Sequence, residues 1–160
     1  MRLAKAMLVF CIICIGFSIP VRAQELLMPK AEIVDTTNHI YTYMEMECDL
    51  AELAAYYKDN MACISIGTSL DSRTIWEVVI GNPQAPKAII IEAAVHGREW
   101  MNSWMLMKQI EELMQNWETP IAEGVKLGDV FEQCAVYVIP MVNPDGVNLV
   151  IQGASAAGDY

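Results

Sequence analysis

A histidine and a glutamate stand three residues apart in the segment 96–100, which reads His-Gly-Arg-Glu-Trp. Imidazole nitrogen and carboxylate oxygen are both zinc ligands, and a catalytic zinc site uses three protein ligands and leaves a fourth position for water. Zinc bound there would lower the pKa of its water and polarise a substrate carbonyl. His96 and Glu99 are therefore candidate zinc ligands. Arg98 is a candidate contact for a substrate carbonyl or carboxylate.

The same spacing has a purely structural interpretation, in which His96 stands at the start of a helix and Glu99 is favoured by the helix dipole. The surrounding sequence is compatible with both. Residues 87–95 are almost continuously apolar, which predicts a buried strand, and an amphipathic helix is expected over 99–117. Gly97 would allow a tight turn between these elements. Spacing alone leaves the metal site and the helix start as open alternatives.

A second strand is predicted over 134–142, and the sequence Asn-Pro-Asp-Gly after it predicts a turn at 143–146. The strand at 87–95 and this one should be parallel, because a helical crossover joins them. Ligands of open α/β sheets bind beyond the carboxyl ends of such strands. His96 and Asn143 both follow strand ends, so we expect them at one edge of the sheet.

The elements before this unit are predicted from capping and β-rich patterns. A helix is expected over 49–59 with Asp49 as its cap, and two antiparallel strands are expected at 62–66 and 74–80. The helix at 99–117 should bury a stripe that consists of Met101, Trp104, Met105, Leu113, Met114 and Trp117.

The first 23 residues have the pattern of a secretory signal peptide. Arg2 and Lys5 give a basic start, an apolar run follows over 6–19, and small residues stand at −3 and −1 of a cleavage site after Ala23. The run is short for a bilayer span, so we expect cleavage and secretion and no stable membrane anchor. The chain is divided into a signal peptide at 1–23, an N-terminal linker at 24–39 and a domain at 40–160.

Composition restricts the partners of this chain. With 160 residues, 54% of them apolar, it has enough apolar surface for one domain core. The formal charge of −10 becomes −13 once residues 1–23, with three basic residues and no acid, are removed. A strongly acidic chain is a poor partner for nucleic acid or an anionic membrane.

Cys48, Cys63 and Cys134 allow either one disulfide with a free thiol or three buried reduced thiols.

Three segments together resemble the zinc carboxypeptidase family, the carboxypeptidase A-like metallopeptidases. The first is 96–100. The second is 139–146, Ile-Pro-Met-Val-Asn-Pro-Asp-Gly, and the third is 66–75, Ile-Gly-Thr-Ser-x-x-x-Arg-x-Ile. They stand in order and at family-like spacing, and the resemblance covers about residues 40–152.

The resemblance implies a zinc-dependent peptidase with an α/β fold, a mixed and mostly parallel sheet, and helices on both faces. In that family the positions matching His96 and Glu99 bind Zn²⁺, and the position matching Arg98 contacts the peptide substrate. The Asn-Pro-Asp-Gly turn is structural support near the site, so Asp145 is not expected to be catalytic. Residues 143–153 look more like the bacterial γ-D-glutamyl-diamino acid peptidases of this family, which cleave peptidoglycan stem peptides, than like its digestive carboxypeptidases.

The family's third zinc ligand and its general-base glutamate lie downstream of the turn. Both are therefore expected beyond Tyr160, and no catalytic residue is assigned within this chain. His39 stands in the predicted entry segment and is not expected to bind the metal. We expect the N-terminal part of a truncated catalytic domain, with an unpaired sheet edge, an aggregation-prone surface and no activity of its own.

Two other functions are compatible with the sequence. One is a non-catalytic secreted binding module that keeps the sheet and part of the pocket. The other is a related zinc amidohydrolase acting on acylated amino acids, which the signal peptide and the Asn-Pro-Asp-Gly turn disfavour.

Overall fold

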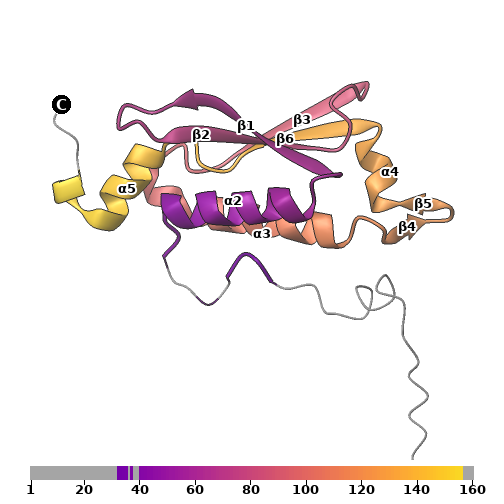
Figure 1. Ribbon diagram of the computed structural model, residues 1–160, viewed down its shortest axis with the longest axis horizontal. Helices are drawn as coiled ribbons and strands as arrows, with labels where there is room; N and C mark the ends of the chain where they lie inside the picture. Colours follow the sequence, from indigo (N-terminus) through magenta and orange to yellow (C-terminus); the bar gives the residue numbers. More distant parts are fainter. Residues whose placement is uncertain (1–31, 36, 38–39, 157–160) are drawn as a thin grey trace, which may run out of the picture. The chain divides into compact units, whose positions relative to one another are not determined.

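The computed structural model describes residues 32–35, 37 and 40–156 (Figure 1). The predicted signal peptide lies outside these residues, as do most of the predicted linker and His39. Among the described residues, no helix combines the length and the apolar character needed to cross a bilayer.

A four-stranded sheet forms one layer of the fold, in the order β1-β2-β6-β3. β1 pairs with β2 and β2 with β6 in antiparallel fashion, while β3 and β6 are parallel. The expected parallel pair and the expected antiparallel hairpin are thus confirmed. The prediction of a mostly parallel sheet is wrong for the described residues. β1 and β2 are joined by a short turn, which permits only antiparallel pairing, and β6 also runs antiparallel to β2. The strands are β1 Met61–Thr68, β2 Thr74–Ile80, β3 Lys87–Glu92 and β6 Cys134–Ile139.

Helix α2 spans Tyr43–Tyr56 and begins earlier than predicted. Its capping box is made by Thr42, whose hydroxyl accepts from the Glu45 backbone N–H at 3.2 Å, and by Glu45, whose carboxylate accepts from the Thr42 N–H at 2.7 Å. Asp49, the predicted cap, instead accepts a hydrogen bond from the Tyr41 hydroxyl at 2.6 Å. The predicted cap is therefore wrong: Thr42 caps the helix, which begins upstream of Asp49.

Helix α3 spans Trp100–Gln115 and follows a 3₁₀ turn, η1, at Gly97–Glu99. The predicted buried stripe is confirmed in part. Met114 is 1% exposed and Trp104, Leu113 and Trp117 pack partly buried against the core, whereas Met101 and Met105 are 54% and 48% exposed. The period is helical, as expected, but the buried face is rotated about the helix axis because contacts with the sheet and α2 set it. The buried side chains of α3 are Ser103, Leu106, Met107, Ile110, Glu111 and Met114.

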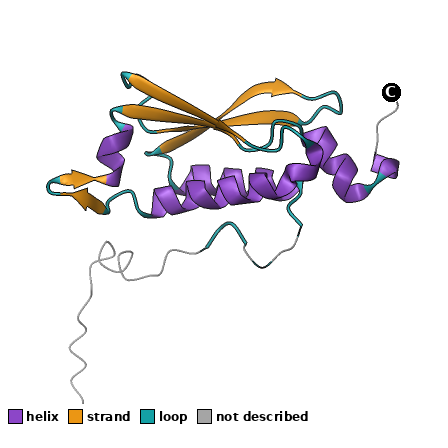
Figure 2. Ribbon diagram, turned by 180° about the vertical axis from the view of Figure 1, so that it is seen from behind, coloured by secondary structure: helices purple, strands orange, loops and turns teal. Residues whose placement is uncertain are grey.

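Helices α2 and α3 lie side by side on one face of the sheet (Figures 1 and 2). The core lies between these layers. Each large apolar side chain buried there contributes about 1.5–3 kcal/mol of transfer free energy. Its fully buried members come from both layers: Met46, Leu53, Val78, Ile80, Met107, Ile110, Met114 and Val138.

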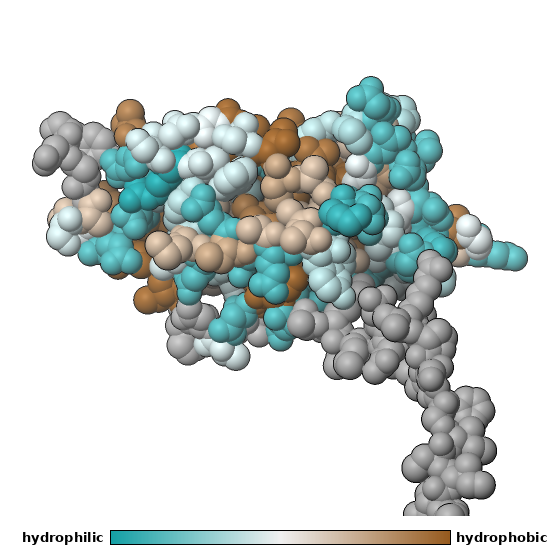
Figure 3. All heavy atoms as spheres, in the orientation of Figure 1, coloured by the Kyte–Doolittle hydropathy of each residue, from teal (hydrophilic) through white to brown (hydrophobic). Residues whose placement is uncertain are grey.

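The other face of the sheet is open among the described residues, which corrects the prediction of helices on both faces. Apolar side chains reach the surface above the sheet in Figure 3. β3 is exposed along its whole length, with Ile90 at 70%, although its apolar sequence predicted burial. The reason is its place at the sheet edge, where β6 is its single neighbour among the described strands.

The remaining elements are short and flank the two layers. Cys48 is exposed, while Cys63 and Cys134 are partly buried, and none of these three forms a disulfide. Burial raises the pKa of Cys63 to about 11, so its thiol stays protonated and unreactive near neutral pH. The short elements are β4 Pro120–Ala122, β5 Val125–Lys126, α4 Leu127–Phe131, α5 Pro144–Gln152 and η2 Ala154–Ala156.

Glu111 is a fully buried acid on α3 that binds the segment before α2. Its carboxylate accepts hydrogen bonds from the backbone N–H groups of Ile33 at 2.6 Å and Val34 at 3.3 Å. The Lys108 ammonium donates to it at 2.9 Å. A buried carboxylate is tolerated when it is paired in this way, so residues 32–35 are held against α3.

The β3 edge generates a prediction about self-association. Exposed edges of β-branched residues pair with other chains. We therefore expect Ile90→Lys to lower the concentration-dependent association of the chain, measured by sedimentation velocity, while stability changes by no more than about 0.5 kcal/mol. Leu70→Lys is the matched control, since Leu70 is 85% exposed in the β1–β2 turn. An equal effect of both substitutions would contradict a role for the β3 edge.

Candidate metal centre

The carboxyl ends of β3 and β6 meet at one edge, as the sequence predicted. Backbone hydrogen bonds continue past the strands, from Ala93 N–H to the Ile139 carbonyl at 3.0 Å and from Val142 N–H to the Ala93 carbonyl at 3.0 Å. The Asn143 N–H then donates to the Ala94 carbonyl at 3.1 Å. The two chain segments that leave the strands are therefore held together at this edge.

Ala94 turns the chain out of β3 toward the histidine. Its φ of 50° lies in the left-handed region, and its side chain is only 1% exposed. That conformation costs an L-residue about 1–2 kcal/mol, so surrounding contacts must hold it. Asn143 supplies two of them, since its N–H donates to Ala94 and its side-chain amide donates to the Val95 carbonyl at 3.3 Å.

His96 and Glu99 lie together directly after this turn. η1 brings them close, with the Glu99 N–H donating to the His96 carbonyl at 2.9 Å. The His96 Nδ1 is 3.3 Å from Glu99 Oε1 and 3.4 Å from Oε2. Both side chains face solvent, at 79% and 51% exposure.

The separation of these donor atoms fits a shared zinc ion. Two ligands bound tetrahedrally at the usual zinc distances lie roughly 3.3–3.6 Å apart. The His96 and Glu99 atoms lie at that separation, where the two groups contact each other directly. Among the described residues, no group of three His, Cys, Asp or Glu side chains is placed to hold a metal ion. The described residues therefore bring together two candidate ligands, where a catalytic zinc site uses three.

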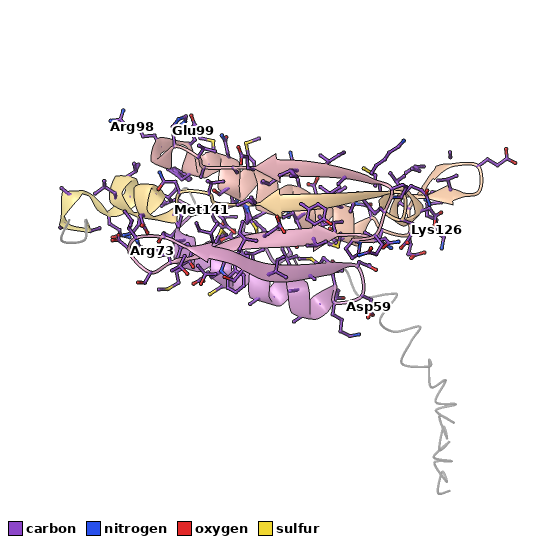
Figure 4. All side chains as sticks on the ribbon, turned by 90° about the horizontal axis from the view of Figure 1, so that it is seen from above. Asp59, Arg73, Arg98, Glu99, Lys126 and Met141 are labelled. Atoms are coloured by element: carbon purple, nitrogen blue, oxygen red, sulfur yellow. The ribbon has the colours of Figure 1, made fainter. Side chains whose placement is uncertain are left out.

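Arg98 stands between the two candidate ligands in sequence, and its side chain is exposed. Figure 4 shows Arg98 and Glu99 at the same end of the molecule as Arg73, and Lys126 at the opposite end. Within the described part of the chain, the Arg98 guanidinium makes no hydrogen bond or ion pair. Its fork of donors is thus available to a carbonyl or carboxylate.

The predicted turn at 143–146 is the first turn of helix α5. Asn143 is the N-cap, and its side-chain oxygen accepts from the Gly146 N–H at 2.8 Å. Gly97 lies directly against this turn, because a Cβ at Gly97 would fall 2.3 Å from the Gly146 carbonyl oxygen. The backbone between the two candidate ligands and the start of α5 are therefore in close contact.

Asp145 connects this turn to the β1–β2 hairpin, a contact that sequence reasoning missed. Its carboxylate accepts from the Ser69 hydroxyl at 2.7 Å, the Asp71 N–H at 3.0 Å and the Arg73 guanidinium at 2.6 Å. Burial tends to raise the pKa of Asp145, but these hydrogen bonds and the Arg73 charge outweigh it, so that the pKa lies below its ordinary value of 3.8. The sequence contained the residues but no local pattern that joined them.

A cavity of about 400 Å³ lies beside this connection, between the hairpin turn and α5. Its lining includes Ser69, Asp71 and Asp145 but none of His96, Arg98 and Glu99. The candidate metal pair is therefore on open surface and outside this cavity.

The described residues thus form an α/β sheet with a His–Glu pair just beyond the carboxyl end of β3. The profile of the zinc carboxypeptidase family matches residues 46–157. The chain belongs to the zinc carboxypeptidase family.

Individual relatives agree with this assignment. The γ-D-glutamyl-L-diamino acid endopeptidase 1 of Lysinibacillus sphaericus is 33% identical over 117 residues, which are 72% of this chain and 29% of that enzyme. Cytosolic carboxypeptidase 2 of Mus musculus is 32% identical over 127 residues, which are 74% of this chain and 14% of that protein.

A solved structure shows the same fold. Carboxypeptidase A from Helicoverpa armigera superposes with a TM-score of 0.63 at 21% identity, over 82% of this chain and 31% of that one. The chain thus spans less than a third of the length of each of these three relatives.

The Gly97–Gly146 contact predicts that adding a methyl group at Gly97 lowers the stability of the fold. Gly97→Ala should destabilise the fold by about 1–3 kcal/mol, because rigid backbone must move to admit the Cβ. The matched control is Gly67→Ala, where a Cβ would meet no atom within 4 Å. Urea denaturation measures both, and equal stabilities of the two variants would contradict the close approach.

The lowered pKa of Asp145 predicts a pH dependence of stability. Its ionised form stabilises the fold fully above its unfolded-state pKa, near 3.8, and this contribution is lost as pH falls below 3.8 through the lower folded-state value. Asp145→Asn should therefore show a shallower loss of unfolding free energy between pH 5 and pH 2 than the unsubstituted chain. Asp129→Asn, a change at an exposed capping residue of α4, should keep the steeper loss. Parallel curves for the chain and Asp145→Asn would exclude this role.

Proposed function

We propose that this chain carries part of the active site of a secreted zinc metallopeptidase that hydrolyses peptide bonds. The observation that carries the proposal is the His96–Glu99 pair, whose donor atoms are spaced for one zinc ion. Its position at the carboxyl edge of the sheet, in a member of the zinc carboxypeptidase family, supports the same function.

Each residue has a separate role in this proposal. His96 and Glu99 hold Zn²⁺, which when bound lowers the pKa of a water molecule and polarises a carbonyl. Arg98 orients the substrate through its free guanidinium. A third ligand and a general base are required to complete the reaction, and we place both outside the described residues.

We propose a peptide substrate, and peptidoglycan stem peptides as its specific class. The 33% identity to a γ-D-glutamyl-L-diamino acid endopeptidase supports the second assignment. A signal peptide at residues 1–23 would deliver the protein to the compartment where such peptides occur.

A non-catalytic binding module is the second candidate function. The observation that favours it is the exposure of His96 and Glu99 without a third ligand among the described residues. Such a module would keep the sheet and the Arg98 contact while lacking turnover.

Zinc titration tests the metal assignment. We expect the chain to bind zinc weakly, and His96→Ala to reduce its affinity by at least about tenfold, because even the loss of an outer-shell partner costs that much. Isothermal titration calorimetry measures the affinity. His39→Ala, which removes the one other histidine, is the matched control and should leave the affinity unchanged. Unaltered zinc binding by His96→Ala would refute the site.

An activity assay separates the two candidate functions. The chain by itself should show no turnover of γ-D-glutamyl peptides with zinc present, because the described residues offer two proposed ligands and we assign no general base among them. A longer gene product that adds a later histidine and glutamate should show chelator-sensitive hydrolysis. Absence of turnover in that longer product would favour the binding module.

A further inference from the structure

The carboxylate of Asp145 binds the start of α5 to the β1–β2 hairpin. Asp145 is 15% exposed and accepts hydrogen bonds from two elements of the hairpin turn, the Ser69 hydroxyl and the Asp71 N–H. Arg73 lies against it as an ion pair at 2.6 Å and pairs with Asp71 at 2.9 Å. These groups fix the carboxylate in one position, because charge-assisted hydrogen bonds reach it from several directions.

The same turn of α5 is in contact with the loop that carries His96 and Glu99. Gly146, the residue after Asp145, touches the backbone of Gly97 so closely that no Cβ fits between them. Asn143, two residues before Asp145, donates to the carbonyls of Ala94 and Val95. The hairpin therefore contacts the first turn of α5 through Asp145, and that turn contacts the loop of the candidate ligands through Asn143 and Gly146.

The loop needs such support on physical grounds. Ala94 is held in a left-handed conformation, and a residue in that region relaxes when its surroundings loosen. His96 is 79% exposed, so its own side-chain packing contributes little to its position. The restraint on the two ligands has to come through the backbone, and the first turn of α5 is the element placed to supply it.

We propose that Asp145 is a positioning residue for the zinc loop. Anchored by Ser69 and Arg73, it fixes the first turn of α5, which in turn holds residues 94–99 in the conformation that brings His96 and Glu99 together. This inference rests on the proposed zinc site. Outer-shell partners in metal sites orient the ligands and raise the affinity for the metal. The proposal gives this role to Asp145, a residue distant in sequence from both ligands.

Two measurements on the full chain test the proposal. In hydrogen–deuterium exchange without metal, Asp145→Asn should raise exchange within residues 94–99 and leave the β1–β2 pairing unchanged. In zinc titration, the same variant should bind about tenfold more weakly. Arg73→Lys keeps the positive charge and should retain most of the affinity. Ser69→Ala, a milder change, provides the same test if Asp145→Asn unfolds.

The matched control is Asp129→Asn, the same chemical change at the cap of α4, next to Lys126 at the opposite end of the molecule (Figure 4). It should alter neither exchange at 94–99 nor zinc affinity. The proposal is overturned if Asp145→Asn and Ser69→Ala leave both readouts as they are, or if exchange rises uniformly along the chain. If zinc binding proves independent of His96, the proposed zinc site fails, and the exchange measurement still decides whether Asp145 positions the loop.

Discussion

The parallel pairing of β3 with β6 is the constraint on which the site depends. It brings two segments that leave the sheet, one with His96 and one with Asn143, to the same edge. Every further contact at the site follows from that adjacency, from the Asn143 bonds to the loop to the close approach of Gly97 and Gly146. A parallel pair requires a long crossover, and α3 fills it while covering the sheet.

The site is built from backbone conformation more than from side-chain packing. Ala94 is strained, His96 and Glu99 face solvent, and the atoms that restrain them are carbonyls and N–H groups of the neighbouring turn. The two side chains held in this way remain accessible from solvent. Their geometry is correspondingly sensitive to small shifts of α5, because a loop with little buried side-chain area has few other contacts to restore it.

Sequence reasoning succeeded where connectivity and local pattern decide the structure. The crossover, the β1–β2 hairpin and the placement of His96 beside Asn143 all follow from neighbouring elements along the chain. It failed where the environment decides. The apolar run of β3 predicted burial, yet the strand is an exposed edge, and the buried face of α3 is set by partners that periodicity alone does not identify. Arg73 and Asp145 are 72 positions apart in the sequence, so no local pattern predicts their ion pair.

The hydrogen bonds between Glu111 and residues 33 and 34 have a consequence for proteolytic cleavage. Endopeptidases bind their substrates as extended strands and need free backbone N–H groups to do so. The N–H groups of Ile33 and Val34 are already engaged by a buried carboxylate, and Val34 has no exposed surface. Endoproteolytic cleavage at Ile33 or Val34 is therefore expected to be slow while the contact with Glu111 is in place.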